Sequence, residues 1–246
     1  MPETGDVDLA AVGTLLGDRA RTRMLLALGD GRALPASRLA SEAGVSAPTA
    51  SSHLGKLVGA GLLRVEPHGR HRYYRLAGRE VGRLLEAMTA LAPPAPVRSL
   101  REGTRARALR EARTCYDHLA GRLGVGLMGS LIERGHLVGG DGRFEPGRAD
   151  RDRLSAYGRD VDYVLSDSGR DLLCDLGVTV PSGPSAIRYC VDWSEQRHHL
   201  SGRLGRALLT RLLELDWVRR APGTRAVTVT ELGRDTLPRA FPGVLA

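Results

Sequence analysis

The chain has 246 residues, of which 42% are hydrophobic and 26% charged, and its formal net charge is +8. This length allows two modest domains, and the composition is that of an ordinary globular protein rather than a disordered or fibrous one. The positive charge favours an anionic partner, for which nucleic acid and a membrane surface are the main candidates.

The segment Met1–Asp8 is acidic, whereas a secretory signal peptide begins with positive charge. No apolar run approaches the roughly 20 residues that a membrane-spanning helix needs. We therefore expect a cytoplasmic protein without a membrane partner. Three cysteines, an odd number in a reducing compartment, argue against a disulfide framework.

Residues 45–61 predict a helix with one apolar and one polar face. Ser46 is a favourable N-cap, and Pro48 fits the first helical turn. The apolar stripe consists of Ala50, Leu54, Leu57 and Val58. The polar side chains can lie in a major groove and hydrogen-bond to base edges. These candidate DNA-binding residues are Ser46, Thr49, Ser51, Ser52, His53 and Lys56.

The next segment, 63–76, predicts a two-stranded ribbon with its turn at Pro67–Gly69. Basic residues gather at and beside the turn, where they would contact phosphates or the minor groove. They are Arg70, His71, Arg72 and Arg75. A polar helix followed by a basic hairpin is typical of a winged helix-turn-helix. The alternative is an ordinary helix and hairpin whose charges are only solvated.

Upstream, residues 8–30 predict two short helices, and residues 36–43, closed by Gly44, predict the first helix of the helix-turn-helix. Together with 45–62 and 69–76, the segment Leu16–Leu25 resembles the ArsR/SmtB family of winged-helix repressors. The resemblance covers about the first 90 residues. It implies a homodimer that occupies a palindromic operator and leaves it when an effector binds.

Residues 80–91 predict an amphipathic helix. It could pack on its own domain, but the resemblance makes a dimer interface at least as plausible. The Pro-rich segment 93–97 predicts a stiff linker. We therefore expect a DNA-binding and dimerisation domain at 1–92 and a second domain at 98–246.

The second domain contains an internal repeat. His118–Leu127 recurs as His199–Leu208, and Leu165–Asp171 recurs as Val229–Asp235. The first piece reads as a helix, and the second as a strand ending in a cap that opens another helix. We expect pseudo-symmetric helix-strand-strand-helix repeats at about 106–178 and 185–241. The predicted fold class is mainly α with small β-hairpins (α+β).

The resemblance implies metal ligands in the helix before the recognition helix or in the dimer helix, but 38–43 and 80–91 contain no Cys or His. A different group of residues has suitable chemistry. Cys115 and His118 would lie one helical turn apart, and Cys190 precedes the pair His198 and His199. Two thiols and two imidazoles would suit a soft metal ion, or a redox or electrophile sensor.

The alternative is that these cysteines are small buried hydrophobic residues and that Asp192 and Glu195 form a helix capping box. We expect Cys174 only to pack within a helix. We expect no enzyme, because neither an oxyanion-type Gly turn, a phosphate-binding loop nor a cofactor motif accompanies the cysteines. The one cofactor that these residues suggest is a soft metal ion.

These observations predict a DNA-binding transcriptional regulator, a homodimeric repressor of an inverted-repeat operator that an effector releases. A sensor acting through the C-terminal Cys and His residues is one alternative. A dimerising scaffold that does not bind DNA is the other.

Overall fold

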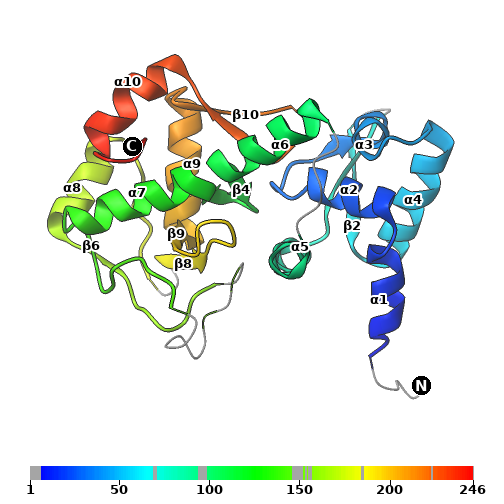
Figure 1. Ribbon diagram of the computed structural model, residues 1–246, viewed down its shortest axis with the longest axis horizontal. Coiled ribbons are helices and arrows are strands. Elements are labelled where there is room, and N and C mark those ends of the chain that lie inside the picture. Colours follow the sequence, from blue (N-terminus) through cyan, green and yellow to red (C-terminus); the bar gives the residue numbers. More distant parts are fainter. Residues whose placement is uncertain are drawn as a thin grey trace. The chain divides into compact units, whose positions relative to one another are not determined.

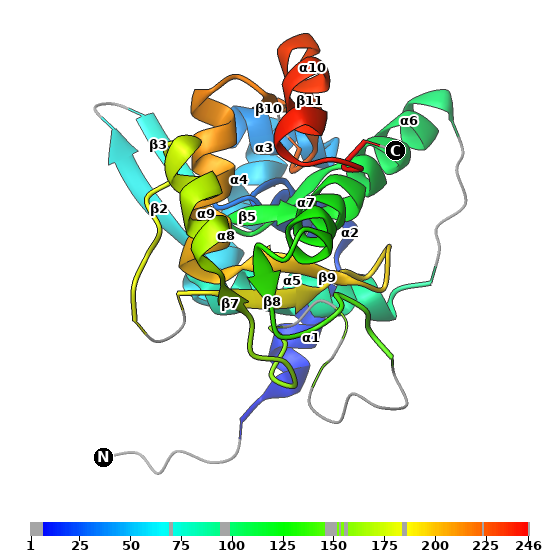
Figure 2. The same ribbon diagram turned by 90° about the vertical axis from the view of Figure 1, so that its left-hand side faces the viewer.

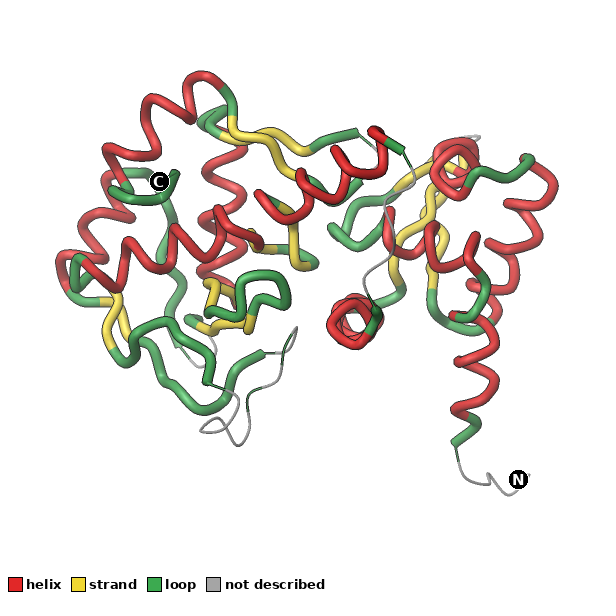
Figure 3. The backbone as a smooth tube through the Cα atoms, in the orientation of Figure 1, coloured by secondary structure: helices red, strands yellow, loops and turns green. Residues whose placement is uncertain are grey.

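The computed structural model describes residues 7–68, 71–93, 99–145, 152, 154, 157–183, 186–222 and 224–245. These residues form helices and short antiparallel hairpins (Figures 1 and 3), which confirms the predicted α+β class. The chain divides into two compact units, Met1–Gly82 and Arg83–Ala246. Residues 94–97 of the expected linker lie outside the described residues, so that domain boundary stays a prediction.

The N-terminal unit is a helical bundle with a three-stranded sheet in the order β1-β3-β2. Its elements are α1 (Leu9–Leu16), α2 (Arg19–Ala27), β1 (Leu34–Pro35), α3 (Ala36–Ala43), α4 (Ala47–Gly59), β2 (Leu63–His68) and β3 (His71–Leu76). The helix α5 (Arg79–Leu91) begins at its end and continues into the second unit.

Local sequence explains the connection between α3 and α4. Gly44 closes α3 in the left-handed conformation at φ 71°, which glycine adopts without a steric penalty. The Ser46 hydroxyl then accepts a hydrogen bond from the Thr49 N–H at 3.4 Å and caps α4. Leu39, Leu54 and Leu57 are fully buried, so both helices face one core. The predicted helix-turn-helix and its ribbon are therefore confirmed.

The C-terminal unit begins with α6 (Leu100–Glu111) and then follows the same order of elements twice: hairpin, helix, hairpin, helix. The first series is β4 (Arg113–Cys115), β5 (His118–Ala120), α7 (Gly121–Glu133), β6 (Leu137–Val138), β7 (Val164–Leu165) and α8 (Asp167–Asp175). The second is β8 (Arg188–Val191), β9 (His198–Ser201), α9 (Gly202–Glu214), β10 (Val218–Arg220), β11 (Val227–Val229) and α10 (Glu231–Ala240). Whether the two series are true repeats stays a prediction.

One expectation about this unit is wrong. His118 and His199 were expected to begin helices, but both lie in strands, β5 and β9. Gly121 and Gly202 directly follow these strands as the first residues of the helices, with φ of 75° and 72°, a backbone conformation that only glycine adopts readily. The helices therefore begin three residues later than the histidines.

The two series share one core. The helix α7 packs against β9, and α9 packs against β5, so each helix contacts the hairpin of the other series (Figure 2). Leu123, Leu127, Leu204 and Leu208 of these helices are buried in one apolar cluster. This exchange of partners brings the two hairpins β4–β5 and β8–β9 together.

Candidate functional site

The helix α4 presents a polar face to solvent. Ala50, Leu54 and Leu57 are fully buried, as the predicted stripe requires. The exposed residues among the candidates are Ser46, Thr49, Ser51, Ser52 and Lys56. Small hydroxyls and one cation on an outward helix face can approach base edges and phosphates in a major groove.

His53 lies differently from these residues. It is half-buried, and its Nδ1 lies 3.5 Å from the Arg21 guanidinium and 3.9 Å from the Asp18 carboxylate. Its ring therefore contacts the start of α2 beside the polar face. A contact between His53 and DNA stays a prediction.

The wing is formed by β2 and β3, paired from Leu63↔Leu76 to His68↔His71. Arg72 is exposed, whereas Arg75 is half-buried and lies 3.3 Å from the Glu66 carboxylate. Arg70 lies outside the described residues, as does the side chain of His71. Their expected role at the tip stays a prediction.

In the C-terminal unit, four sequence-predicted residues come together. Cys115 pairs with His118 across β4 and β5, and Cys190 pairs with His199 across β8 and β9. The two sulfur atoms and one nitrogen of each imidazole all lie within 4.8 Å of one another, and the four side chains are buried. We call these four residues the Cys–His cluster. Cys115 and His118 are thus cross-strand neighbours and not residues of one helical turn.

Each imidazole of the cluster has a carboxylate beside its Nδ1. His118 Nδ1 lies 3.1 Å from Asp117, and His199 Nδ1 lies 3.6 Å from Asp192. The Nε2 atoms of both rings are buried and have no hydrogen-bond partner among the described residues. The two rings stack with centroids 5.2 Å apart.

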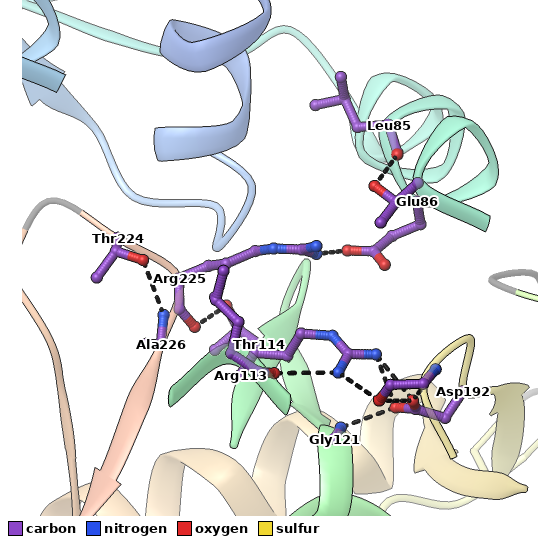
Figure 4. Close-up of polar contacts among 12 residues, drawn as sticks. Leu85, Glu86, Arg113, Thr114, Gly121, Asp192, Thr224, Arg225 and Ala226 are labelled. Atoms are coloured by element: carbon purple, nitrogen blue, oxygen red, sulfur yellow. Dashed lines mark hydrogen bonds and ion pairs between the residues drawn. The ribbon is translucent and has the colours of Figure 1, made fainter. Parts of the chain in front are cut away.

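Asp192 connects the cluster to neighbouring residues through hydrogen bonds. Figure 4 shows Arg113 pointing at its carboxylate, and both oxygens accept hydrogen bonds from Arg113 Nη2 at 2.9 Å. The Gly121 N–H donates to the same carboxylate at 2.7 Å. Asp192 also accepts from the backbone of Ser194 and Glu195 within the β8–β9 loop. The expected helix capping box is therefore wrong, because this carboxylate caps a turn between strands.

The electrostatics follow from burial and these partners. Burial lowers the pKa of His199 to about 3, so this imidazole is neutral. Burial would raise the pKa of Asp192, but the Arg113 guanidinium holds it well below its usual range. Burial also opposes the charged form of His118, but Cys115 and Asp117 raise its pKa to about 9. The hydrogen bond with Cys190, together with burial, raises the pKa of the Cys115 thiol.

The other predicted residues lie elsewhere. His198 points away from the Cys–His cluster, with its Nδ1 2.8 Å from the Tyr163 hydroxyl and its ring stacked on Tyr189. Cys174 is exposed on α8, which corrects the expectation of plain helix packing. Sequence reasoning missed Asp117 as a partner of the cluster. A signal was present, because each of the two cysteines of the cluster is followed two positions later by an aspartate.

No helix in the described part of the chain is long and apolar enough to cross a bilayer.

Comparison with known proteins agrees with the fold of the N-terminal unit. A family model described as a helix-turn-helix domain matches residues 16–66. YdfF of Bacillus subtilis, an HTH-type transcriptional regulator, is 41% identical over 231 residues, which cover 92% of this chain and 94% of the relative. The HTH-type transcriptional regulator CmtR of Mycobacterium tuberculosis is 37% identical over 87 residues, covering 34% of this chain and 73% of the relative.

Two solved structures are also similar to part of the chain. The cadmium metal-sensor CmtR of Mycobacterium tuberculosis is 33% identical, covering 38% of this chain and 100% of that one, with a TM-score of 0.30. The transcriptional repressor BigR of Xylella fastidiosa is 22% identical, covering 35% of this chain and 88% of that one, with a TM-score of 0.33.

The match to YdfF extends over nearly the whole of both chains, so it includes the C-terminal unit as well as the winged helix. The family model and the match to CmtR confirm that the first 90 residues resemble helix-turn-helix transcriptional regulators. The chain therefore belongs to the family of HTH-type transcriptional regulators that includes YdfF, and it is a DNA-binding transcriptional regulator.

Proposed function

We propose that the protein is a homodimeric repressor that binds an inverted-repeat operator and releases it when an effector reaches the C-terminal unit. The observation that carries this proposal is the two-faced helix α4. Its apolar stripe is buried, while Thr49, Ser52 and Lys56 are exposed on a face that nothing else in the described N-terminal unit covers. The protein acts in the cytoplasm and has no catalytic activity of its own.

A dimer is supported by apolar side chains left exposed on α1 and α5. Leu9 is 76% exposed and Leu91 86%, and Leu84 is 37% exposed. These exposed leucines are the side chains of each helix that a partner chain would cover. A second copy of the chain would give a two-fold symmetric dimer, which reads an inverted repeat with half-sites about one helical turn (roughly 10 bp) or a multiple apart.

The effector site that we propose is the Cys–His cluster, which gathers the soft ligands of the C-terminal unit in one buried position. Its donor atoms suit a soft metal ion, and its thiols also suit an oxidant or electrophile. A non-binding scaffold has no comparable support, because the polar face of α4 is intact.

The wing is tested by the salt dependence of DNA binding. Replacing Arg70 and Arg72 by Ala should weaken specific and non-specific binding alike, and the slope of log K against log salt should shrink by about 0.9 for each lost phosphate contact. Arg206→Ala, an exposed arginine on α9, is the matched control and should leave the slope unchanged. An unchanged slope in the double variant contradicts the wing contacts.

The dimer is tested by sedimentation and footprinting. Leu84→Asp, alone or combined with Leu91→Asp, should split the dimer and reduce protection to a single half-site. Leu232→Asp places the same change on another exposed apolar residue, 50% exposed on α10, and should stay dimeric. A wild-type monomer that protects one asymmetric half-site contradicts the proposal.

A further inference from the structure

We infer that Cys115, His118, Cys190 and His199 bind a single metal ion of the zinc class in a closed, four-coordinate site. This inference deepens the proposed function and rests on it in one respect: it gives the chemistry of the effector site. The existence of the metal site can be tested without DNA.

The donor set and its burial match a closed tetrahedral site. Two thiolates and two imidazoles are a common ligand set for Zn²⁺, with bonds of about 2.3 Å to sulfur and 2.0–2.1 Å to nitrogen. The four donor atoms already lie within 4.8 Å of one another. All four ligands come from the protein and are buried, so no coordination position is left open to solvent or substrate.

The buried imidazole nitrogens favour a metal over simple thiol oxidation. The Nε2 atoms of His118 and His199 have no hydrogen-bond partner among the described residues, although both rings are buried. A disulfide between Cys115 and Cys190 would leave both nitrogens unpaired, which is unfavourable for buried polar atoms. A single metal ion gives all four donor atoms a partner.

The carboxylates beside the rings set the orientation of the ligands. Asp117 lies 3.1 Å from His118 Nδ1, and Asp192 lies 3.6 Å from His199 Nδ1, which makes no hydrogen bond among the described residues; a carboxylate beside each Nδ1 favours Nε2 as the nitrogen that binds a metal. Metal binding then releases to solvent the protons that the ligands carry on their donor atoms, and the two thiolates balance the charge of the ion. Asp192 needs no further counter-charge, because Arg113 already pairs with it.

The ion would join the two series of elements in the C-terminal unit, because each hairpin supplies one cysteine and one histidine. The helices are placed to hold this arrangement. A Cβ at Gly205 of α9 would lie 3.2 Å from His118 Cβ, and a Cβ at Gly124 of α7 would lie 3.8 Å from His199 Cβ. Binding should therefore stabilise the C-terminal unit.

The test uses reduced, metal-free, full-length protein titrated with Co²⁺ and then with Zn²⁺. We expect one equivalent of cobalt per chain, with the visible bands of tetrahedral Co²⁺ and a thiolate-to-cobalt charge-transfer band. One equivalent of Zn²⁺ should remove both. Zn²⁺ should also protect Cys115 and Cys190, but not Cys174, from alkylation mapped by mass spectrometry.

Variants separate ligands from bystanders. Cys115→Ser and Cys190→Ser should each reduce the charge-transfer band and weaken binding by at least the 10–100-fold that loss of an outer-shell partner costs. Asp117→Asn should weaken binding about 10–100-fold while the tetrahedral spectrum is kept, as expected of a positioning residue. Cys174→Ser, on the exposed face of α8, is the matched control and should bind as the wild type does.

The site can be tested even if a serine variant does not fold, because the cobalt spectrum and the alkylation pattern of the wild-type protein show whether the metal binds. No charge-transfer band in the wild type, or a Cys115–Cys190 disulfide that forms in place of metal binding, overturns the site. Specific operator binding in that case leaves the proposed repressor standing. Stoichiometric metal binding that does not alter operator affinity supports the site and contradicts only its role as the effector site.

Discussion

The helix α4 and the Cys–His cluster place polar groups in opposite environments. On α4 the hydroxyls of Ser51 and Ser52 face solvent, above a stripe of buried leucines. In the cluster, His118 and His199 are each 1% exposed. An exposed polar group can be removed at little cost to stability, whereas a buried one leaves its partner unpaired. The two sites should therefore respond differently to the same kind of substitution.

The largest expected effect is at Arg113. This arginine is 1% exposed, and its replacement by Met would leave the Asp192 carboxylate buried without its cation. We expect a loss of about 3–5 kcal/mol in the free energy of unfolding, measured by urea denaturation of the full chain. Arg122→Met removes an exposed ion pair with Glu111 and should cost about 0–1 kcal/mol. Equal losses in the two variants would contradict the role assigned to Arg113.

A smaller effect is expected within α7, where two glycines lie in different surroundings. A Cβ at Gly124 would lie 2.5 Å from the Leu119 carbonyl oxygen, whereas a Cβ at Gly129 meets nothing within 4 Å. Gly124→Ala should therefore destabilise the protein by about 1–3 kcal/mol through overpacking. Gly129→Ala should stabilise it by about 0.5–1 kcal/mol through helix propensity. Thermal unfolding that shifts in the same direction for both would contradict the close packing of α7 on β5.

The N-terminal unit could be predicted from the sequence because its signals are local. Ser46, the stripe through Leu54 and the turn after Pro67 each specify structure within a few residues of themselves. The predicted recognition helix and ribbon therefore agree with α4, β2 and β3. The sequence did not show that His53 contacts the start of α2, because that contact joins residues far apart in the chain.

The sequence predicts the residues of the Cys–His cluster from their side-chain types, but it predicts the wrong secondary structure for them. A helix through Cys115 and His118 is the wrong expectation, because these residues pair across the β4–β5 hairpin, whose turn holds Tyr116 at a φ of 58°. For the same reason His198 was grouped with His199. Successive side chains of a strand point to opposite faces, and β9 directs His198 toward Tyr163 and His199 toward the cluster.

The smallest expected effects compare two exposed serines of the same helical segment, one that caps the helix and one that does not. Ser46→Ala removes the cap of α4 and should lower the free energy of unfolding by about 1 kcal/mol. Ser51→Ala should change it by no more than about 0.5 kcal/mol, because this side chain is exposed. For operator affinity we expect the larger effect at Ser51. Ser51→Ala should weaken specific binding and leave the salt slope unchanged, because a base contact carries no counterion release. If Ser51→Ala leaves operator affinity untouched, the polar face of α4 does not read bases at this position.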